Sequence, residues 1–265
     1  MTGSGHTDFA VGCQDAFHTN YKEIRDPRRL ALGVDDPLIL AVADGAGSSR
    51  YSAAAATLAV SIATAIASEQ LLDYGWDDTT KVELVSLLQH IFTETRRSVE
   101  SGVRGAIRGH SGTLRLQDFR STLAVAILRP PWLLTLQVGD GFIVIESGPG
   151  SHVLLGGPPP AGEEANMATF LDAPMDPRTH VVQALRCPEL TGVALSTDGL
   201  ETLALDYQAG GPRTPHADLF NPLFRGVADA TWSSERILRL LRSPRVLEGT
   251  SDDTTLLVAT KVPSD

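Results

Sequence analysis

The chain has 265 residues, of which 42% are hydrophobic and 20% charged, so it can bury a sizeable core and is neither disordered nor fibrous. Its formal net charge of −10 argues against binding to nucleic acid or to an anionic membrane surface. Two cysteines outside any CxxC pair, no apolar run of membrane-spanning length and no signal peptide lead us to expect a cytoplasmic protein without a disulfide framework or a zinc site.

The first half of the chain predicts one strand and two helices. Residues 38–43 (LILAVA) form a short apolar run that is typical of a buried strand. Residues 52–70 are rich in alanine and predict a helix, and residues 79–101 have apolar positions near helical spacing, which predicts a second, amphipathic helix. Residues 102–113 are rich in glycine and predict a loop.

Three strand-like runs follow, at residues 121–128, 132–138 and 142–146, joined by Arg129-Pro130-Pro131 and by Gly139-Asp140-Gly141. Connections that short allow only antiparallel neighbours, because a parallel crossover needs a dozen residues or more. The runs are apolar almost throughout, so both faces of the sheet must be covered. The pattern therefore predicts a β-sandwich with helices packed outside it.

The second half predicts further strands and helices. Glycine and proline make residues 148–165 typical of a surface loop. Strands are predicted at 179–185, 192–196 and 254–261, a short helix at 200–205, and helical material at 217–241 that is broken near Thr231-Trp232 and capped at Ser233. Since no internal repeat or linker is visible, we expect one domain, residues 1–265.

Several aspartates lie at the ends of predicted strands. Asp44 ends a strand and precedes a helix (LILAVADGAGSS), and Asp198 does the same (VALSTDGLET). Asp140 lies in a predicted hairpin turn (LQVGDGFIVI), Asp252 precedes the last strand beside a second aspartate (GTSDDTTLLV), and Asp15 follows the N-terminal segment. Each alone could be a turn residue, because Asp-Gly tolerates positive φ.

As a set, these residues predict a rim of carboxylates at the end of a sheet. Carboxylates close together repel one another unless a cation neutralises them, and hard divalent cations prefer oxygen ligands. A two-metal site can polarise a water molecule and stabilise in-line attack at phosphorus. Gly45, which has no side chain, would let a metal approach its backbone carbonyl.

The motifs QDA, VADGAG, STLAVAIL, LQVGDGFIVI, ALSTDGLE and SDDTTLLVAT, in this order from about residue 5 to residue 260, resemble the metal-dependent PPM, or type 2C, protein phosphatases. The segment GEEANMATFLD is similar to a bacterial branch of that family. The resemblance implies an α+β, four-layer α/β/β/α sandwich of two antiparallel β-sheets flanked by helices, in agreement with the strand pattern. It also implies a serine/threonine phosphoprotein phosphatase with two Mn²⁺ or Mg²⁺ ions and a weaker third site, in which metal-bound water hydrolyses a phosphomonoester without a phospho-enzyme.

The resemblance also implies a role for each matched residue. Asp44 would bridge two metals, and Gly45 would contribute its carbonyl. Asp198 and Asp252 would ligate one metal, which makes Asp44, Asp198 and Asp252 the catalytic set. Asp15 would act on the other metal through water, and Asp140 would belong to the third site.

The chain departs from the family pattern at three positions. Ala10 stands where the family has a phosphate-binding arginine, Ala46 where some members have a histidine, and Thr202 where a third-site aspartate is usual. His6 is our candidate for the missing phosphate contact, because an imidazole can donate a hydrogen bond to a phosphate oxygen. Arg50 and Arg120 are the next candidates.

Two functions remain open from the sequence. The chain is either a phosphatase that acts on a phosphorylated protein, with a cognate Ser/Thr kinase as a further partner, or a catalytically weak pseudo-phosphatase that binds phosphoproteins as a regulatory module. The retained aspartates favour catalysis, since a binding module has no reason to keep uncompensated carboxylates together. The missing arginine favours the alternative.

Overall fold

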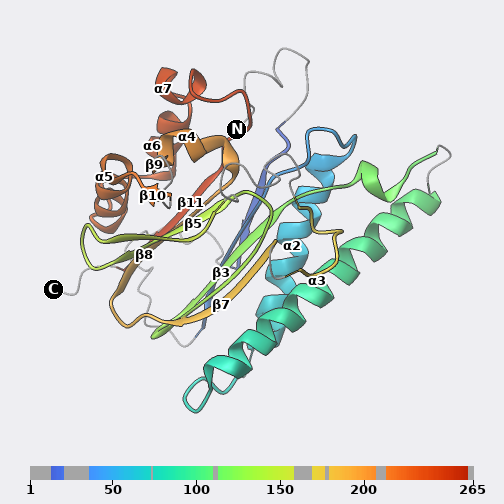
Figure 1. The fold of residues 1–265 in the computed structure, drawn as a ribbon, viewed down its shortest axis with the longest axis horizontal. Helices are drawn as coiled ribbons and strands as arrows, with labels where there is room; N and C mark the ends of the chain where they lie inside the picture. Colours follow the sequence, from blue (N-terminus) through green and yellow to red (C-terminus); the bar gives the residue numbers. More distant parts are fainter. Residues whose placement is uncertain are drawn as a thin grey trace.

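The computed structural model describes residues 13–20, 36–72, 74–109, 113–157, 169–176, 179–206 and 213–261. These residues form four layers, with two long helices on one side, two β-sheets in the middle, and a group of shorter helices on the other side (Figure 1). The predicted four-layer sandwich of antiparallel sheets is therefore confirmed.

The first sheet has the strand order β1-β2-β3-β4-β7, and all its neighbours are antiparallel. Its strands are β1 (Ala16–Thr19), β2 (Leu38–Ala43), β3 (Leu123–Arg129), β4 (Trp132–Val138) and β7 (His180–Arg186). The second sheet has the order β11-β8-β5-β6, again antiparallel throughout. Its strands are β5 (Phe142–Ser147), β6 (His152–Gly156), β8 (Leu190–Ser196) and β11 (Leu256–Thr260). Two short strands, β9 (Leu205–Asp206) and β10 (Thr214–Pro215), pair separately.

Alternation along β2 shows why the strands are apolar on both faces. Leu38, Leu40 and Val42 face the second sheet and pack with apolar residues of β5 and β8. Ile39 and Ala41, which point the other way, belong to the core beneath the two long helices. Successive side chains of a strand point to opposite faces, so a strand buried on both sides must be apolar at every position.

The two long helices are α2 (Ser52–Leu71) and α3 (Lys81–Gly109), and they cover the outer face of the first sheet. Ala55, Ala59 and Ala63 of α2 are buried there, and their small side chains allow the helix to lie close to the sheet. Among the described residues, α2 is the one helix whose length and composition would allow it to cross a membrane. In this fold α2 packs against the first sheet and against α3, which contacts the same sheet beside it.

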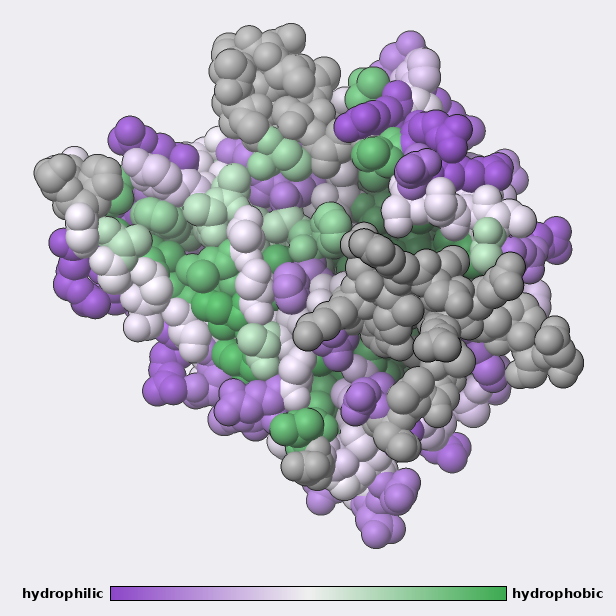
Figure 2. Space-filling model, turned by 180° about the vertical axis from the view of Figure 1, so that it is seen from behind, coloured by the Kyte–Doolittle hydropathy of each residue, from purple (hydrophilic) through white to green (hydrophobic). Residues whose placement is uncertain are grey.

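The outer face of the second sheet is covered by α4 (Glu201–Ala204), α5 (Ala217–Ala228), α6 (Ser234–Leu241) and α7 (Pro244–Leu247), with the 3₁₀ turn η3 (Asp198–Leu200) leading into α4. Phe220, Leu223 and Phe224 of α5 pack on Phe142 and Val144 of β5. A second 3₁₀ turn, η2 (Leu116–Asp118), lies before β3. On the face opposite to that of Figure 1, hydrophobic residues are visible near the middle and hydrophilic residues form much of the rim (Figure 2).

The predicted loop at residues 102–113 is wrong over most of its length, because α3 continues to Gly109. Val103 is buried and Ile107 packs against the core beneath this helix. Arg104 forms an ion pair with Glu100 one turn earlier, at 2.6 Å. These contacts outweigh the helix-breaking tendency of the glycines, which cost about 1 kcal/mol each relative to alanine.

The predicted surface loop at residues 148–165 is also wrong in part. β6 lies within it and pairs with β5, and residues 158–165 lie outside the described residues. The prediction gave weight to the surrounding glycines and prolines rather than to the apolar residues of HVLLG.

The Gly139-Asp140-Gly141 connection is not a hairpin turn, because β4 belongs to the first sheet and β5 to the second. The Arg129-Pro130-Pro131 connection does join antiparallel neighbours, β3 and β4, as predicted. Gln137, buried at the end of β4, donates its side-chain N–H to the carbonyl oxygens of Gly139 (3.2 Å) and Gly141 (2.5 Å). This amide therefore fixes the point at which the chain crosses between the sheets.

Candidate metal centre

Strand pairing brings the aspartates to one end of the two sheets. β1 begins at Ala16 opposite Ala43, the last residue of β2, so Asp15 and Asp44 are neighbours. In the second sheet, Ser196 at the end of β8 pairs with both Phe142 and Leu256, the first residues of β5 and β11. Asp198, Asp140 and Asp252 lie just beyond these three strand ends, on the same side.

The backbone of Asp44 is held by the segment that leads into β3. Its N–H donates to the Thr122 hydroxyl at 2.9 Å, and the Thr122 N–H donates to the Asp44 carbonyl oxygen at 2.8 Å. A side chain on Gly45 would lie 2.7–2.8 Å from backbone and side-chain atoms of Ser52, the first residue of α2. Glycine is therefore required at this position by packing.

A hydrogen-bond network joins the segments that carry Asp15, Asp198 and Asp252. The Thr197 hydroxyl donates to the Asp15 carboxylate at 2.8 Å and accepts from the Thr255 N–H at 3.1 Å. The Gln14 N–H donates to the Asp253 carboxylate at 2.6 Å. These bonds fix the relative position of three chain segments that lie far apart in the sequence.

Sequence reasoning assigned no role to Gln14, Thr197 or Asp253. The available signal was their position, because each is directly adjacent to one of the predicted site aspartates. Gln14 also donates its side-chain N–H to the Ser52 hydroxyl at 2.6 Å, so it contacts α2 as well.

Four of the site aspartates, Asp15, Asp44, Asp140 and Asp198, have raised pKa values because they are partly buried close to one another. Burial, and then the negative charges of Asp15 and Asp198, raise the pKa of Asp44 to about 10. Burial, followed by the charge of Asp140, raises the pKa of Asp198 to about 7. The pKa of Asp15 rises to about 6 through burial, against the lowering effect of its hydrogen bonds, and burial also raises the pKa of Asp140.

Unpaired oxygen atoms show that the centre fits a cation. One carboxylate oxygen of Asp15, one of Asp140 and one of Asp198 are buried without a hydrogen-bond partner. Buried acceptors without partners are costly, and a hard divalent cation would satisfy them while removing the repulsion. Within the described ranges, no three His, Cys, Asp or Glu side chains surround a single point as ligands of one ion do. The carboxylates thus interact electrostatically without forming a closed ligand shell.

The residues considered for phosphate binding are placed only in part. Arg120 donates to the Asp172 carboxylate at 3.1 Å, and its backbone carbonyl accepts from the N–H of Ala46, two residues after Asp44. Arg50 lies over the Tyr51 ring, 5.3 Å from its centre. His6 and Ala10 lie outside the described residues. Thr202, in place of the third-site aspartate, donates to the carbonyl of Gly249 at 3.2 Å.

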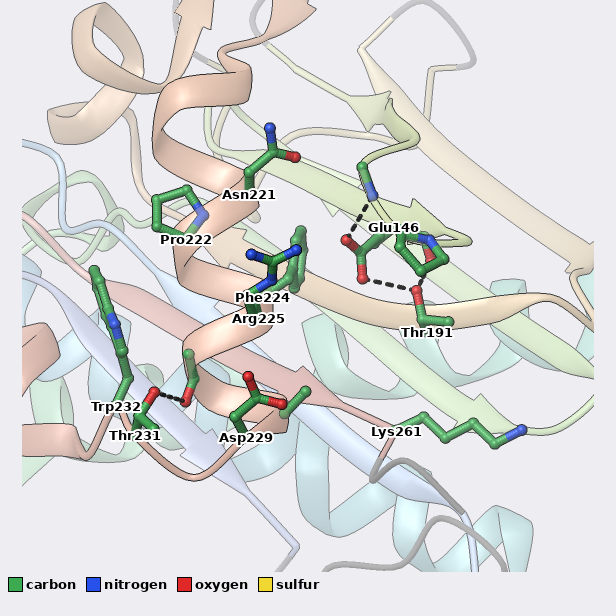
Figure 3. A pocket seen from close by; sticks show the side chains of 14 residues that line it. Glu146, Thr191, Asn221, Pro222, Phe224, Arg225, Asp229, Thr231, Trp232 and Lys261 are labelled. Carbon is green, nitrogen blue, oxygen red and sulfur yellow. Dashed lines mark hydrogen bonds between the residues drawn. The ribbon is translucent and has the colours of Figure 1, made fainter. Parts of the chain in front are cut away.

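A pocket of ≈ 1010 Å³ lies away from the site aspartates (Figure 3). It is lined by Glu146, Thr191 and Lys261, from the far ends of β5, β8 and β11, together with one side of α5 and Trp232. A strand of six residues is about 20 Å long, so this pocket is at the opposite end of the second sheet from the aspartates. It is not the centre that the aspartates form.

Comparison with known proteins identifies the class of protein. Residues 2–242 match the family described as Protein phosphatase 2C, and the chain belongs to this family. It is 32% identical over 269 residues to Serine/threonine-protein phosphatase 3 of Escherichia coli (strain K12). The aligned region covers 97% of this chain and 94% of that protein.

Two solved structures show the same fold. The S. agalactiae serine/threonine phosphatase matches with a TM-score of 0.59 at 14% identity, covering 94% of this chain and 93% of that chain. A structure described as a bacterial serine phosphatase matches with a TM-score of 0.57 at 13% identity, covering 96% of this chain and 94% of that chain.

Proposed function

We propose that this chain is a metal-dependent serine/threonine phosphoprotein phosphatase, with Asp44, Asp198 and Asp252 as its catalytic residues. The observation that carries the proposal is the group of partly buried aspartates at one end of the sandwich, in which burial and neighbouring carboxylates raise the pKa values of Asp44 and Asp198. Family membership and the 32% identical phosphatase of E. coli support the same activity. We also propose a single domain, residues 1–265, that works in the cytoplasm.

The aspartates and Gly45 would hold two Mn²⁺ or Mg²⁺ ions, and Asp140 would contribute to a weaker third site. Such ions polarise water and neutralise the charge of a phosphomonoester, which is what direct hydrolysis requires. The chain itself supplies the positioning. Thr197 orients the Asp15 carboxylate, the Gln14–Asp253 bond holds the N-terminal segment against the segment of Asp252, and Thr122 holds Asp44.

The direct test is hydrolysis of p-nitrophenyl phosphate and of a phosphothreonine peptide by the purified chain with Mn²⁺ or Mg²⁺. We expect turnover that EDTA abolishes and that Asp44→Asn reduces by at least about a hundredfold, since an amide is a poorer ligand for a hard cation than a carboxylate. A circular dichroism spectrum checks that the variant is folded. Equal activity in EDTA would refute metal dependence.

The alternative function is a pseudo-phosphatase that binds phosphoproteins without turnover. Ala10 at the position of the family arginine and the absence of a closed ligand shell within the described ranges favour it. Calorimetric titration with Mn²⁺ separates the two functions when it is run beside the turnover assay. Metal binding without hydrolysis of any phosphopeptide would support the alternative.

The phosphate contact and the partners remain proposals. We propose that His6 contributes a hydrogen bond to the substrate phosphate, so that His6→Ala raises KM several-fold and leaves metal affinity unchanged. A kinase that phosphorylates the same substrate protein is the partner that this activity implies. Unchanged kinetics in His6→Ala would turn attention to Arg50 and Arg120.

A further inference from the structure

Four arginines follow one another at three-residue spacing through α6, the turn after it and α7. Arg236, Arg239, Arg242 and Arg245 are all exposed, and we call them the arginine row. The row is unusual in a chain whose formal net charge is −10. Residues 233–247 contain these four cations and a single acidic residue, Glu235.

Three members of the row have no ionic partner in the part of the chain that the structure describes. Two exposed arginines of α3 provide the contrast, since Arg97 and Arg104 pair with glutamates of their own helix at 2.6 Å. The side chains of Arg239, Arg242 and Arg245 make no such contact, and Arg236 lies over the Trp232 ring at 4.6 Å. The charge of the row is therefore available to an external anion.

Two exposed leucines lie among these arginines. Leu238 and Leu247 are 39% and 41% exposed, although Leu241 of the same helix is buried. The surface thus combines cations with apolar contacts, as protein-docking surfaces commonly do. A guanidinium can bind a carboxylate through two parallel hydrogen bonds, which favours acidic side chains as the ligand.

The end of the arginine row is close to the metal centre in the sequence and in the fold. α7 is followed by Gly249, whose carbonyl accepts from Thr202 of α4, and then by Asp252. α4 follows η3, which begins at Asp198, so the chain between α7 and Asp252 lies beside the segment that follows Asp198. In Figure 1 the labels of α4, α6 and α7 stand together at one end of the helical layer.

We propose that the arginine row binds an acidic segment of the phosphoprotein substrate and so directs a phosphorylated residue near that segment to the metal centre. This inference rests on the proposed function. A protein segment fits better than nucleic acid or an anionic membrane, because a long polyanion or a charged surface would also meet the rest of an acidic protein. A short acidic segment needs to contact only the row. On α6, Arg236 and Arg239 are about 4.5 Å apart in axial rise, so two carboxylates of one segment can be engaged together there.

The test compares the wild type with the triple variant Arg239→Gln, Arg242→Gln, Arg245→Gln. The substrates are a phosphothreonine peptide with acidic flanking residues, the same peptide with neutral flanks, and p-nitrophenyl phosphate. We expect KM for the acidic peptide to rise about tenfold, with kcat and the other two substrates unchanged. The matched control, Arg97→Gln, Arg104→Gln, Arg108→Gln, removes the same charge from α3 and should leave all three substrates unchanged.

A binding measurement separates failure of this inference from failure of the proposed function. Fluorescence anisotropy with the acidic peptide lacking phosphate needs no turnover, and the triple variant should bind it about tenfold more weakly than wild type or control. Equal binding by the triple variant and wild type overturns the inference, even if the phosphatase is active. Tighter binding to anionic vesicles or to DNA than to the peptide, lost in the triple variant, overturns the choice of a protein partner.

Discussion

Asp198→Asn should make the metal-free protein more stable at neutral pH while removing activity. In the fold, burial and neighbouring charges raise the pKa of the Asp198 carboxyl from its ordinary 3.8 to about 7. The native state therefore binds more protons than the unfolded state between these values, and the free energy of unfolding falls as pH rises through that window. At 1.36 kcal/mol per pKa unit, the raised pKa of Asp198 lowers the free energy of unfolding of the wild type by about 2 kcal/mol at pH 5 and about 4 kcal/mol at pH 8. Solvent screening at the rim reduces both values.

An uncharged asparagine avoids this cost, so the advantage of the variant should grow with pH. Urea unfolding in EDTA at pH 5 and pH 8 measures it, with Asp77→Asn in an exposed turn as the control. Saturating Mn²⁺ should reverse the order at pH 8, because the wild type gains binding energy that the variant lacks. If the variant in EDTA were less stable than wild type by the same amount at both pH values, the pKa of Asp198 would not be raised in the fold, and the reasoning would be refuted.

Three further predictions concern positions around the centre. Thr197→Val should weaken Mn²⁺ binding several-fold in calorimetry and lower stability by about 1–3 kcal/mol, whereas Thr197→Ser should restore both, since the hydroxyl bonds to a site carboxylate. Asp140→Asn should reduce Mn²⁺ affinity less than Asp44→Asn does, and a larger loss would reverse our ranking of the two positions. Gly199→Ala should cost about 1–3 kcal/mol in thermal unfolding, because a Cβ there would collide with a backbone carbonyl before β11, while Gly75→Ala, with open space around it, should change little.

The elements that the sequence predicted best are those buried on both faces. The strands at 38–43 and 132–138 are found with the predicted bounds, and the strand at 142–146 is one residue longer than predicted. A strand between two covering layers is apolar at every position, and the turn residues on either side mark where it ends. Helix α2 is likewise found at 52–71, one residue longer than predicted.

The errors arise where tertiary packing decides the conformation. The glycines of α3 favour a loop locally, but Val103 and Ile107 gain burial only if the helix continues. The three-residue connection at Asp140 looks like a hairpin, since nothing local shows that β4 and β5 join different sheets. That crossing depends on the buried Gln137 amide, whose partners are backbone carbonyls and leave no trace in the sequence pattern.

The convergence of the aspartates could be predicted from the sequence, but the hydrogen bonds that hold their segments in place could not. Strand ends place carboxylates at a common rim, so their convergence follows from the strand pattern. The bonds of Thr197 to Asp15 and of Gln14 to Asp253 join residues 182 and 239 positions apart. Pairings of such separation depend on the register of several strands at once, which the spacing of motifs does not determine.

Metal binding and stability should be linked in this fold, because the site aspartates follow strands of both sheets. Asp44 follows a strand of the first sheet and Asp198 a strand of the second, so the repulsion between their carboxylates acts between the two sheets at one end of the sandwich. The apolar core between the sheets and the hydrogen bonds of Thr197 oppose that repulsion. A cation held by both aspartates would turn the same charges into a link between the sheets. The residues that would make hydrolysis possible are therefore the ones that destabilise the metal-free protein, and the charge that destabilises it is what the cation binds.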